Sequence, residues 1–200
     1  MPSSIGILLF DGVEELDFVG PWEVFTMANE VAPKFAMAPP FTVELIAEGS
    51  APICCAKNMR VLPDRTTKEI AALDILLVPG GIGTRREASN PALLAWIRQI
   101  ATNSEWITSV CTGALLLAAA GPARGKRVTT HWAFVETLRA RGEAAEVVAD
   151  QRYVRDGNVV TAAGVSAGID MALWLVAELL GAEFARAVKH AMEYDPAPPV

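Results

Sequence analysis

Histidine is scarce in this chain, and its metal-binding residue types are not clustered. The 200 residues include two histidines and three cysteines. Zinc sites need three or four Cys, His or acidic ligands in a compact arrangement, whereas Cys54 and Cys55 are adjacent and Cys111 stands alone. We therefore expect no metal ion, and an odd number of cysteines with an adjacent pair does not indicate a disulfide framework.

The sequence also lacks a basic cluster, a long apolar run and a recognisable leader. Its net charge of −6 at pH 7 would repel a phosphate backbone, so no nucleic-acid partner is expected. Asp, Glu or Gly interrupts the apolar stretches before they reach membrane-spanning length, so no membrane association is expected. Residues 1–4 lack the charged region that opens a signal peptide. These absences predict a cytoplasmic protein.

Apolar residues, by contrast, are abundant. They make up 52% of the chain against 20% charged residues, which is typical of a compact globular protein. A length of 200 residues suits one domain, and no linker, repeat or low-complexity segment divides the chain. We predict a single domain over residues 1–200.

Strand-like and helix-like patterns alternate along the chain. Strands are predicted at residues 5–10, 41–47, 74–78, 106–110 and 128–130, with a weaker β region at 54–62 and a hairpin at 153–162. Helices are predicted to begin near Pro21 and to cover 90–102, 112–120, 132–141, 166–180 and 182–194. This alternation predicts an α/β fold whose mostly parallel sheet is covered on both faces. Ligands of such sheets bind beyond the carboxyl ends of the strands.

Cys111 lies where the predicted strand 106–110 meets the helix that follows. The small residues Ser109 and Gly113 stand two positions to either side, as a sharp strand-to-helix nucleophile elbow requires. The helix N-terminus would favour a thiolate and could hold developing negative charge. We predict that Cys111 is a nucleophile, the alternative being a buried structural cysteine.

A glycine loop follows the buried strand 74–78. Gly80, Gly81 and Gly83 allow close approach of the backbone to a ligand, which predicts an oxyanion hole beside Cys111. A tight turn that merely needs glycine is the alternative. The loop lacks the Gly-Lys-Ser/Thr of a phosphate-binding loop.

Asp17 is the candidate proton carrier. It stands between Leu16 and Phe18, so partial burial would raise its pKa and suit it to proton transfer. A helix cap is the alternative, and Glu14 and Glu15 are expected to be solvated neighbours.

The two histidines give weaker signals. His131 ends the predicted strand 128–130 and could approach Cys111, or it could be a hydrogen-bonded structural residue. His190 and Glu193 have the helical spacing of a possible glutaminase base pair, but a solvated helix face is favoured. Three aromatic residues could line an apolar pocket, although core packing explains them equally well: Trp22, Trp132 and Phe134.

Taken together, these motifs resemble the ThiJ/PfpI superfamily, and within it the isonitrile hydratase branch. The resemblance spans nearly the whole chain. It rests on Leu16-Asp17 with Gly20-Pro21, Pro79-Gly80-Gly81 with Gly83, Cys111-Thr112-Gly113, Thr129-Thr130-His131-Trp132 and the terminal Glu193-Tyr194-x-Pro-Ala-Pro-Pro.

The resemblance implies a flavodoxin-like three-layer α/β sandwich that forms homodimers. It implies hydration of an isonitrile, R–N≡C, to an N-substituted formamide through a covalent thioimidate, without metal or organic cofactor. Cys111 would be the nucleophile, Asp17 the acid and base, and Thr112 the neighbour of the sulfur. His131 and Trp132 would be possible pocket residues.

One departure and several alternatives stay open. Protease- and amidase-like members carry His directly after the cysteine, where this chain has Thr112, so those activities are not expected. An aldehyde- or methylglyoxal-handling or redox-responsive cysteine protein remains possible on sequence alone. So does the ligand-sensing domain of an AraC-type transcription regulator, although no basic recognition helix is found before Val200.

Overall fold

The structure is a computed structural model that describes residues 2–196. Residues 197–199, which belong to the terminal proline motif used in the resemblance, lie outside the described residues.

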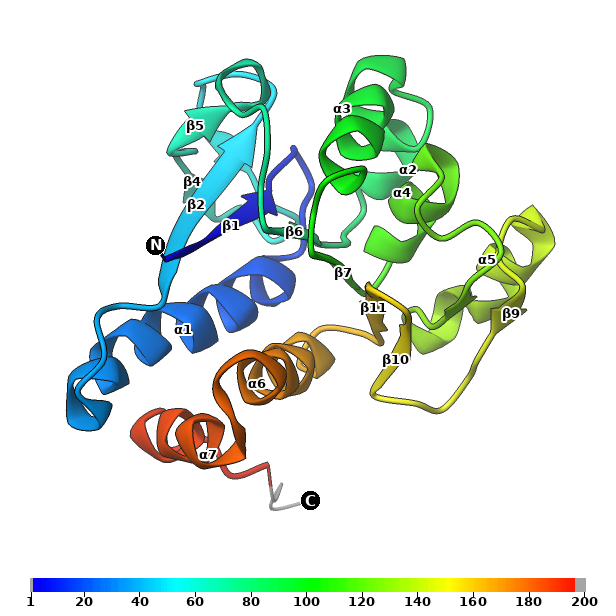
Figure 1. The fold of residues 1–200 in the computed structure, drawn as a ribbon. Helices are drawn as coiled ribbons and strands as arrows, with labels where there is room; N and C mark the ends of the chain where they lie inside the picture. Colours follow the sequence, from blue (N-terminus) through cyan, green and yellow to red (C-terminus); the bar gives the residue numbers. More distant parts are fainter. Residues whose placement is uncertain (1, 197–200) are drawn as a thin grey trace.

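One central sheet organises the described chain (Figure 1). Its strands are β1 (Ser3–Leu8), β2 (Phe41–Ala47), β5 (Arg65–Thr66), β6 (Ile75–Val78), β7 (Trp106–Val110), β10 (Tyr153–Asp156) and β11 (Val159–Ala162). Their order in the sheet is β10-β11-β7-β6-β1-β2-β5. Neighbours run parallel except β10, which pairs antiparallel with β11.

Helices cover both faces of this sheet (Figure 1). One layer holds α1 (Glu15–Val31), α6 (Ala167–Leu180) and α7 (Ala182–Ala191). The other holds α2 (Thr84–Glu87), α3 (Pro91–Ala101) and α4 (Gly113–Ala120), with α5 (Val135–Arg141) beside α4. The flavodoxin-like three-layer α/β fold is therefore confirmed.

Short elements complete the fold. Strands β3 (Ile53–Cys54) and β4 (Arg60–Val61) form a hairpin within the predicted β region, and β8 (Arg127–Val128) pairs in parallel with β9 (Glu146–Val147). Every residue of β6 and β7 is buried, as expected for central strands covered on both faces. These two buried strands end at the glycine loop and at Cys111.

The start of α1 differs from the prediction. The helix begins at Glu15, so Pro21 lies inside it instead of opening it. An interior proline removes one helical hydrogen bond and costs about 3 kcal/mol. Close packing against α6 offsets this loss, because a Cβ on Gly168 would lie 3.2 Å from the Pro21 ring and one on Gly20 would lie 2.8 Å from Ile169. The earlier start places Asp17 within the first turn of α1.

Smaller differences occur at element ends. Strand β8 stops at Val128, the segment 132–134 forms a 3₁₀ turn before α5, and α7 ends at Ala191. The hairpin prediction is confirmed, since Gly157 takes the positive φ of 63° that its turn needs between β10 and β11.

Candidate active site

The carboxyl ends of four parallel strands meet at one place on the sheet edge. The segments that follow β1, β6, β7 and β11 carry Asp17, in the first turn of α1, and Gly80, Cys111 and Val165, respectively. These residues are up to about 150 positions apart in sequence, yet hydrogen bonds or direct contacts join them. The sheet topology therefore assembles the candidate site.

Cys111 has the backbone of a nucleophile elbow. Its φ of 57° lies in the left-handed region that a side chain rarely adopts. Its N–H donates to the carbonyls of Ala162 and Ala163 at 3.1 and 2.8 Å, and its own carbonyl accepts from Thr130 Oγ1 at 2.8 Å. These bonds hold the strained conformation in place.

Gly113 is required by the same turn. A Cβ at this position would lie 2.0 Å from the carbonyl oxygen of Val78, which is backbone and cannot move aside. The close approach of α4 to β6 explains why a small residue stands two places after the cysteine. The sequence prediction of an elbow at Cys111 therefore agrees with the structure.

Asp17 is fully buried beside the cysteine. Its Oδ2 accepts from the Gly80 N–H at 2.8 Å, while Oδ1 has no partner of ordinary hydrogen-bond geometry among the described residues. Burial raises the pKa of Asp17 to about 7, with a smaller contribution from the charge of Glu14, against the lowering effects of Gly80 and the Cys111 thiol. The carboxyl can therefore exchange a proton near neutral pH.

Burial also changes the expected state of Cys111. Only 7% of its surface is exposed, and burial, followed by the nearby Asp17 charge, raises its pKa to about 12. The Thr112 N–H and hydroxyl and the Val165 N–H lower this pKa but do not outweigh burial. Burial therefore acts against the ready thiolate that was expected at the start of α4, because desolvation exceeds the effect of the helix end.

The glycine loop does not form the oxyanion hole that the sequence predicted. The N–H of Gly80 donates to Asp17, that of Gly81 to Thr112 Oγ1 at 3.0 Å, and that of Gly83 to the Gly12 carbonyl at 3.0 Å. An amide engaged in this way has no proton left for a substrate. The loop instead holds Asp17 and Thr112 in position. Residue 80 must be glycine, because a Cβ there would lie 2.5 Å from the Thr112 nitrogen.

Thr112 belongs to a small buried hydroxyl network. Its Oγ1 accepts from the Gly81 N–H and lies 3.2 Å from Thr84 Oγ1. Thr84 Oγ1 donates to the Gly81 carbonyl at 2.8 Å. The Thr112 hydroxyl can donate to the Gly81 carbonyl, 3.3 Å away, or to the Cys111 sulfur.

A cavity of about 420 Å³ opens at the cysteine. Its lining combines polar and apolar side chains: Glu14, Ala56, Lys57, Gly81, Ile82, Arg85, Cys111, Thr112, His131, Phe134 and Val165. His131 is thus near the site, with Nδ1 accepting from the Ala133 N–H at 3.2 Å. Phe134 lines the cavity as one of the three aromatic candidates.

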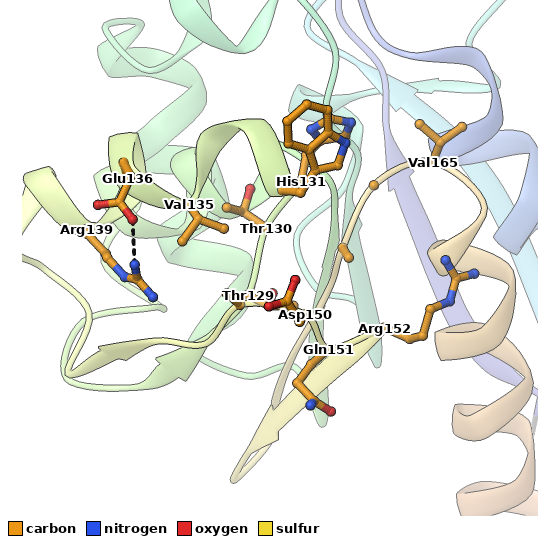
Figure 2. Close-up of a pocket in the computed structure, with 14 residues that line it drawn as sticks. Thr129, Thr130, His131, Val135, Glu136, Arg139, Asp150, Gln151, Arg152 and Val165 are labelled. Atoms are coloured by element: carbon orange, nitrogen blue, oxygen red, sulfur yellow. Dashed lines mark hydrogen bonds and ion pairs between the residues drawn. The ribbon is translucent and has the colours of Figure 1, made fainter.

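Trp132 does not line the cysteine cavity. Its side chain is 79% exposed and borders a neighbouring hollow, drawn in Figure 2, which shares His131 and Val165 with the cysteine cavity. Trp22 does not line the cavity either. Both were candidates from residue type alone, and residue type does not show where a side chain on a helix or in a turn points.

Sequence reasoning missed several cavity residues. Glu14 was expected to be solvated, but its side chain is only 17% exposed and pairs with Lys57, which the β3–β4 hairpin supplies. Arg85 and Val165 were not singled out. Val165 comes three residues after the end of β11, so the strand-end rule could have found it, whereas nothing in the sequence places Lys57 at the site.

Other candidates lie elsewhere. His190 and Glu193 are exposed at the end of α7 and line a different hollow, so they do not face Cys111. Residues 2–196 contain no group of three or more His, Cys, Asp or Glu residues that could hold a metal ion. No helix in this part of the chain is long and apolar enough to cross a membrane.

The fold and the site define a flavodoxin-like α/β protein with a cysteine at a nucleophile elbow and a buried carboxyl beside it. The model of the DJ-1/PfpI family matches residues 3–178. The chain belongs to this family.

Individual relatives differ in what they are named for. Isonitrile hydratase of Pseudomonas putida is 39% identical over 199 residues, which cover 100% of this chain and 82% of that protein. The HTH-type transcriptional regulator CdhR of Pseudomonas aeruginosa is 28% identical and matches 92% of this chain but 53% of its own length. A crystal structure of a THiJ/PfpI family protein from Pseudomonas syringae has a TM-score of 0.89 at 32% identity, covering 100% of this chain and 78% of that one.

Proposed function

We propose that this protein is an isonitrile hydratase that converts R–N≡C and water into R–NH–CHO. The observation that carries the proposal is the Asp17 carboxyl, buried against the Cys111 thiol with Oδ1 unpartnered and with a pKa of about 7. The similarity to a named isonitrile hydratase over the whole chain supports the same reaction. We also propose, from the resemblance, one domain that works as a cytoplasmic homodimer without a cofactor.

The first chemical step uses the single proton that the pair holds near neutral pH. The Cys111 sulfur attacks the terminal isonitrile carbon while its proton passes to Asp17. The protonated Asp17 then delivers that proton to the same carbon. The product is the thioimidate R–N=CH–S–Cys111. It contains all the atoms of the substrate and of the thiol, so nothing has left at this stage.

The second step hydrates this intermediate. The Asp17 carboxylate removes a proton from water as the water oxygen adds to the thioimidate carbon, and the proton passes to the nitrogen. The tetrahedral adduct R–NH–CH(OH)–S–Cys111 then expels sulfur, which regains a proton from the hydroxyl through Asp17. Formamide leaves, and the pair returns to its one-proton state.

Charge that builds on sulfur is met by backbone donors. The N–H groups of Thr112 and Val165 both lower the pKa of Cys111, so they stabilise negative charge at that atom. These donors favour the transient thiolate that forms when the thiol proton passes to Asp17, and they stabilise the sulfur again when it leaves the tetrahedral adduct. This role differs from the oxyanion hole that was predicted for the glycine loop.

The direct test is to incubate the purified protein with an alkyl isonitrile and measure formamide. We expect turnover by the wild type, none by Cys111→Ala, and a loss of about 10²–10⁴-fold for Asp17→Asn, which keeps the size of the side chain but not its proton transfer. Mass spectrometry should find the substrate mass added to Cys111 when turnover is slowed.

Two outcomes would redirect the proposal. An adduct that persists on another residue of Cys111→Ser would sink the assignment of the nucleophile. No formamide from a wild type whose Cys111 reacts with thiol reagents would contradict the hydratase and favour the aldehyde-handling or redox alternative. A ligand-sensing role, suggested by the similarity to the regulator CdhR, predicts isonitrile binding without turnover.

A further inference from the structure

Resting on the proposed function, we infer that the substrate carries an anionic group, such as a carboxylate, which Arg85 binds at the mouth of the Cys111 cavity. The inference concerns the chemical class of R. Arg85 enters the site from α2, directly after the glycine loop.

The guanidinium of Arg85 is held in a fixed position. It lies over the Phe134 ring, 4.5 Å from the ring centroid, and its NH1 donates to the Gly81 carbonyl at 3.0 Å. Both partners line the same cavity as Cys111. The other N–H groups of this planar, oriented guanidinium remain for another acceptor. A carboxylate can accept two parallel hydrogen bonds from them.

The charge of Arg85 is not compensated, unlike that of the other cation in the cavity. Lys57 pairs with Glu14 and lies 3.9 Å from Glu15. Among the described residues, no carboxylate lies within ion-pair distance of Arg85. The neighbouring Arg86 provides the contrast, because it forms an ion pair with Glu87 at 2.6 Å and does not line the cavity.

The surfaces around the sulfur and the guanidinium are partly apolar. Ile82, Phe134 and Val165 line the cavity together with Cys111 and Arg85. Such walls suit a short hydrocarbon segment with the isonitrile carbon at one end and the anion at the other. Arg85 is an exposed residue, and a neutral R group would leave its guanidinium without a charged partner.

The first test needs no isonitrile and therefore does not depend on the hydratase. Cys111 is alkylated at one pH with iodoacetate, which is anionic, and with iodoacetamide, its neutral counterpart. The ratio of the two rates cancels any change in thiol reactivity. We expect Arg85→Gln to lower the iodoacetate-to-iodoacetamide ratio about tenfold, the scale of a hydrogen bond to a charged group, while the matched control Arg86→Gln leaves it unchanged.

The second test uses isonitriles that differ only in charge. A series of ω-isocyanoalkanoates is compared with the corresponding methyl esters. The wild type should favour the carboxylates in kcat/KM by about tenfold at the best chain length. Arg85→Gln should bring the carboxylate-to-ester ratio of kcat/KM close to one, and this ratio is the readout, whatever the absolute rate of the variant.

The outcomes separate the two proposals. An alkylation ratio equal in wild type and Arg85→Gln overturns the anion site. If Arg85→Gln reduces the turnover of esters and of carboxylates by the same factor, the anion site is also overturned. The proposed hydratase function is not affected by that result. A ratio that depends on Arg85 together with no turnover of any isonitrile supports an anion site in a protein that is not a hydratase.

Discussion

At the scale of single residues, the Asp17 and Cys111 side chains work as one titrating unit. Burial raises the pKa of both groups, and the charge of Asp17 raises that of Cys111 further, whereas the thiol lowers that of Asp17 by hydrogen bonding. The thiol therefore keeps its proton while the carboxyl changes state near pH 7. Apparent pKa values of such a pair belong to both groups together. The chemistry proposed here needs one proton on the pair, neither two nor none.

This requirement predicts a pH dependence of activity. Below about pH 7 Asp17 becomes protonated, and no base remains to accept the thiol proton. We therefore expect kcat/KM for an isonitrile to fall as pH decreases through about 7 and to be level above it, because the thiol pKa of about 12 lies far higher.

The measurement is a pH–rate profile with wild type and Asp17→Asn side by side. Asp17→Asn should lose most of its activity, and what remains should no longer fall as the pH decreases through about 7. A profile of the wild type that is flat from pH 5 to 8 would contradict the shared-proton mechanism.

At the scale of structural elements, the β7–α4 turn sets the position of the sulfur. The strained cysteine donates its N–H to carbonyls at the end of β11 and accepts from Thr130, and β6 lies close to Gly113 of the same turn. The turn is therefore rigid because three neighbouring segments hold it. Substitutions in it should affect stability and cysteine reactivity together.

Gly113→Ala tests this rigidity. The added Cβ would lie 2.0 Å from the Val78 carbonyl oxygen, so α4 or β6 must shift, and we expect a loss of about 3 kcal/mol in the free energy of unfolding. Gly49→Ala is the matched control, because nothing lies within 4 Å of its Cβ, and it should change stability by less than about 0.5 kcal/mol. Urea unfolding followed by circular dichroism measures both, and equal midpoints for the two variants would show that the close approach is not maintained in solution.

At the scale of the whole molecule, the buried Asp17 of the site lowers the free energy of unfolding at neutral pH. Asp17 has no exposed surface, and ionising it inside the protein is unfavourable. In the unfolded chain its carboxyl ionises at about 3.8, whereas in the folded protein it keeps its proton up to about 7. Between these values the folded state binds more protons than the unfolded state, so stability decreases as pH rises.

Asp17→Asn removes this dependence while keeping an acceptor for the Gly80 N–H. The unfolding free energy of the wild type, relative to that of the variant, should therefore fall by up to about 4 kcal/mol from pH 4 to pH 7.5. Denaturant unfolding of both proteins at several pH values measures the difference, in which the effects of the other carboxyl groups cancel. A difference that does not change with pH would mean that Asp17 ionises normally in the folded protein.

Much of this architecture was determined by the sequence itself. The alternation of apolar runs and helical patterns predicted the parallel α/β fold, and Asn90-Pro91 and Gly157 marked a helix start and a hairpin turn correctly. Cys111 was found because a strand, a small-residue pattern and a helix meet there. These signals are local, and local backbone preferences and side-chain periodicity determine them directly.

The tertiary structure alone decided the properties of the site. Burial, not the helix end, sets the protonation of Cys111, and the glycine amides are already occupied by Asp17 and Thr112. Arg85 and Lys57 come to the cavity from separate segments, and only one of them keeps an unpaired charge. Desolvation, hydrogen-bond partners and ion pairs depend on which segments pack together, and no local pattern in the sequence specifies that packing.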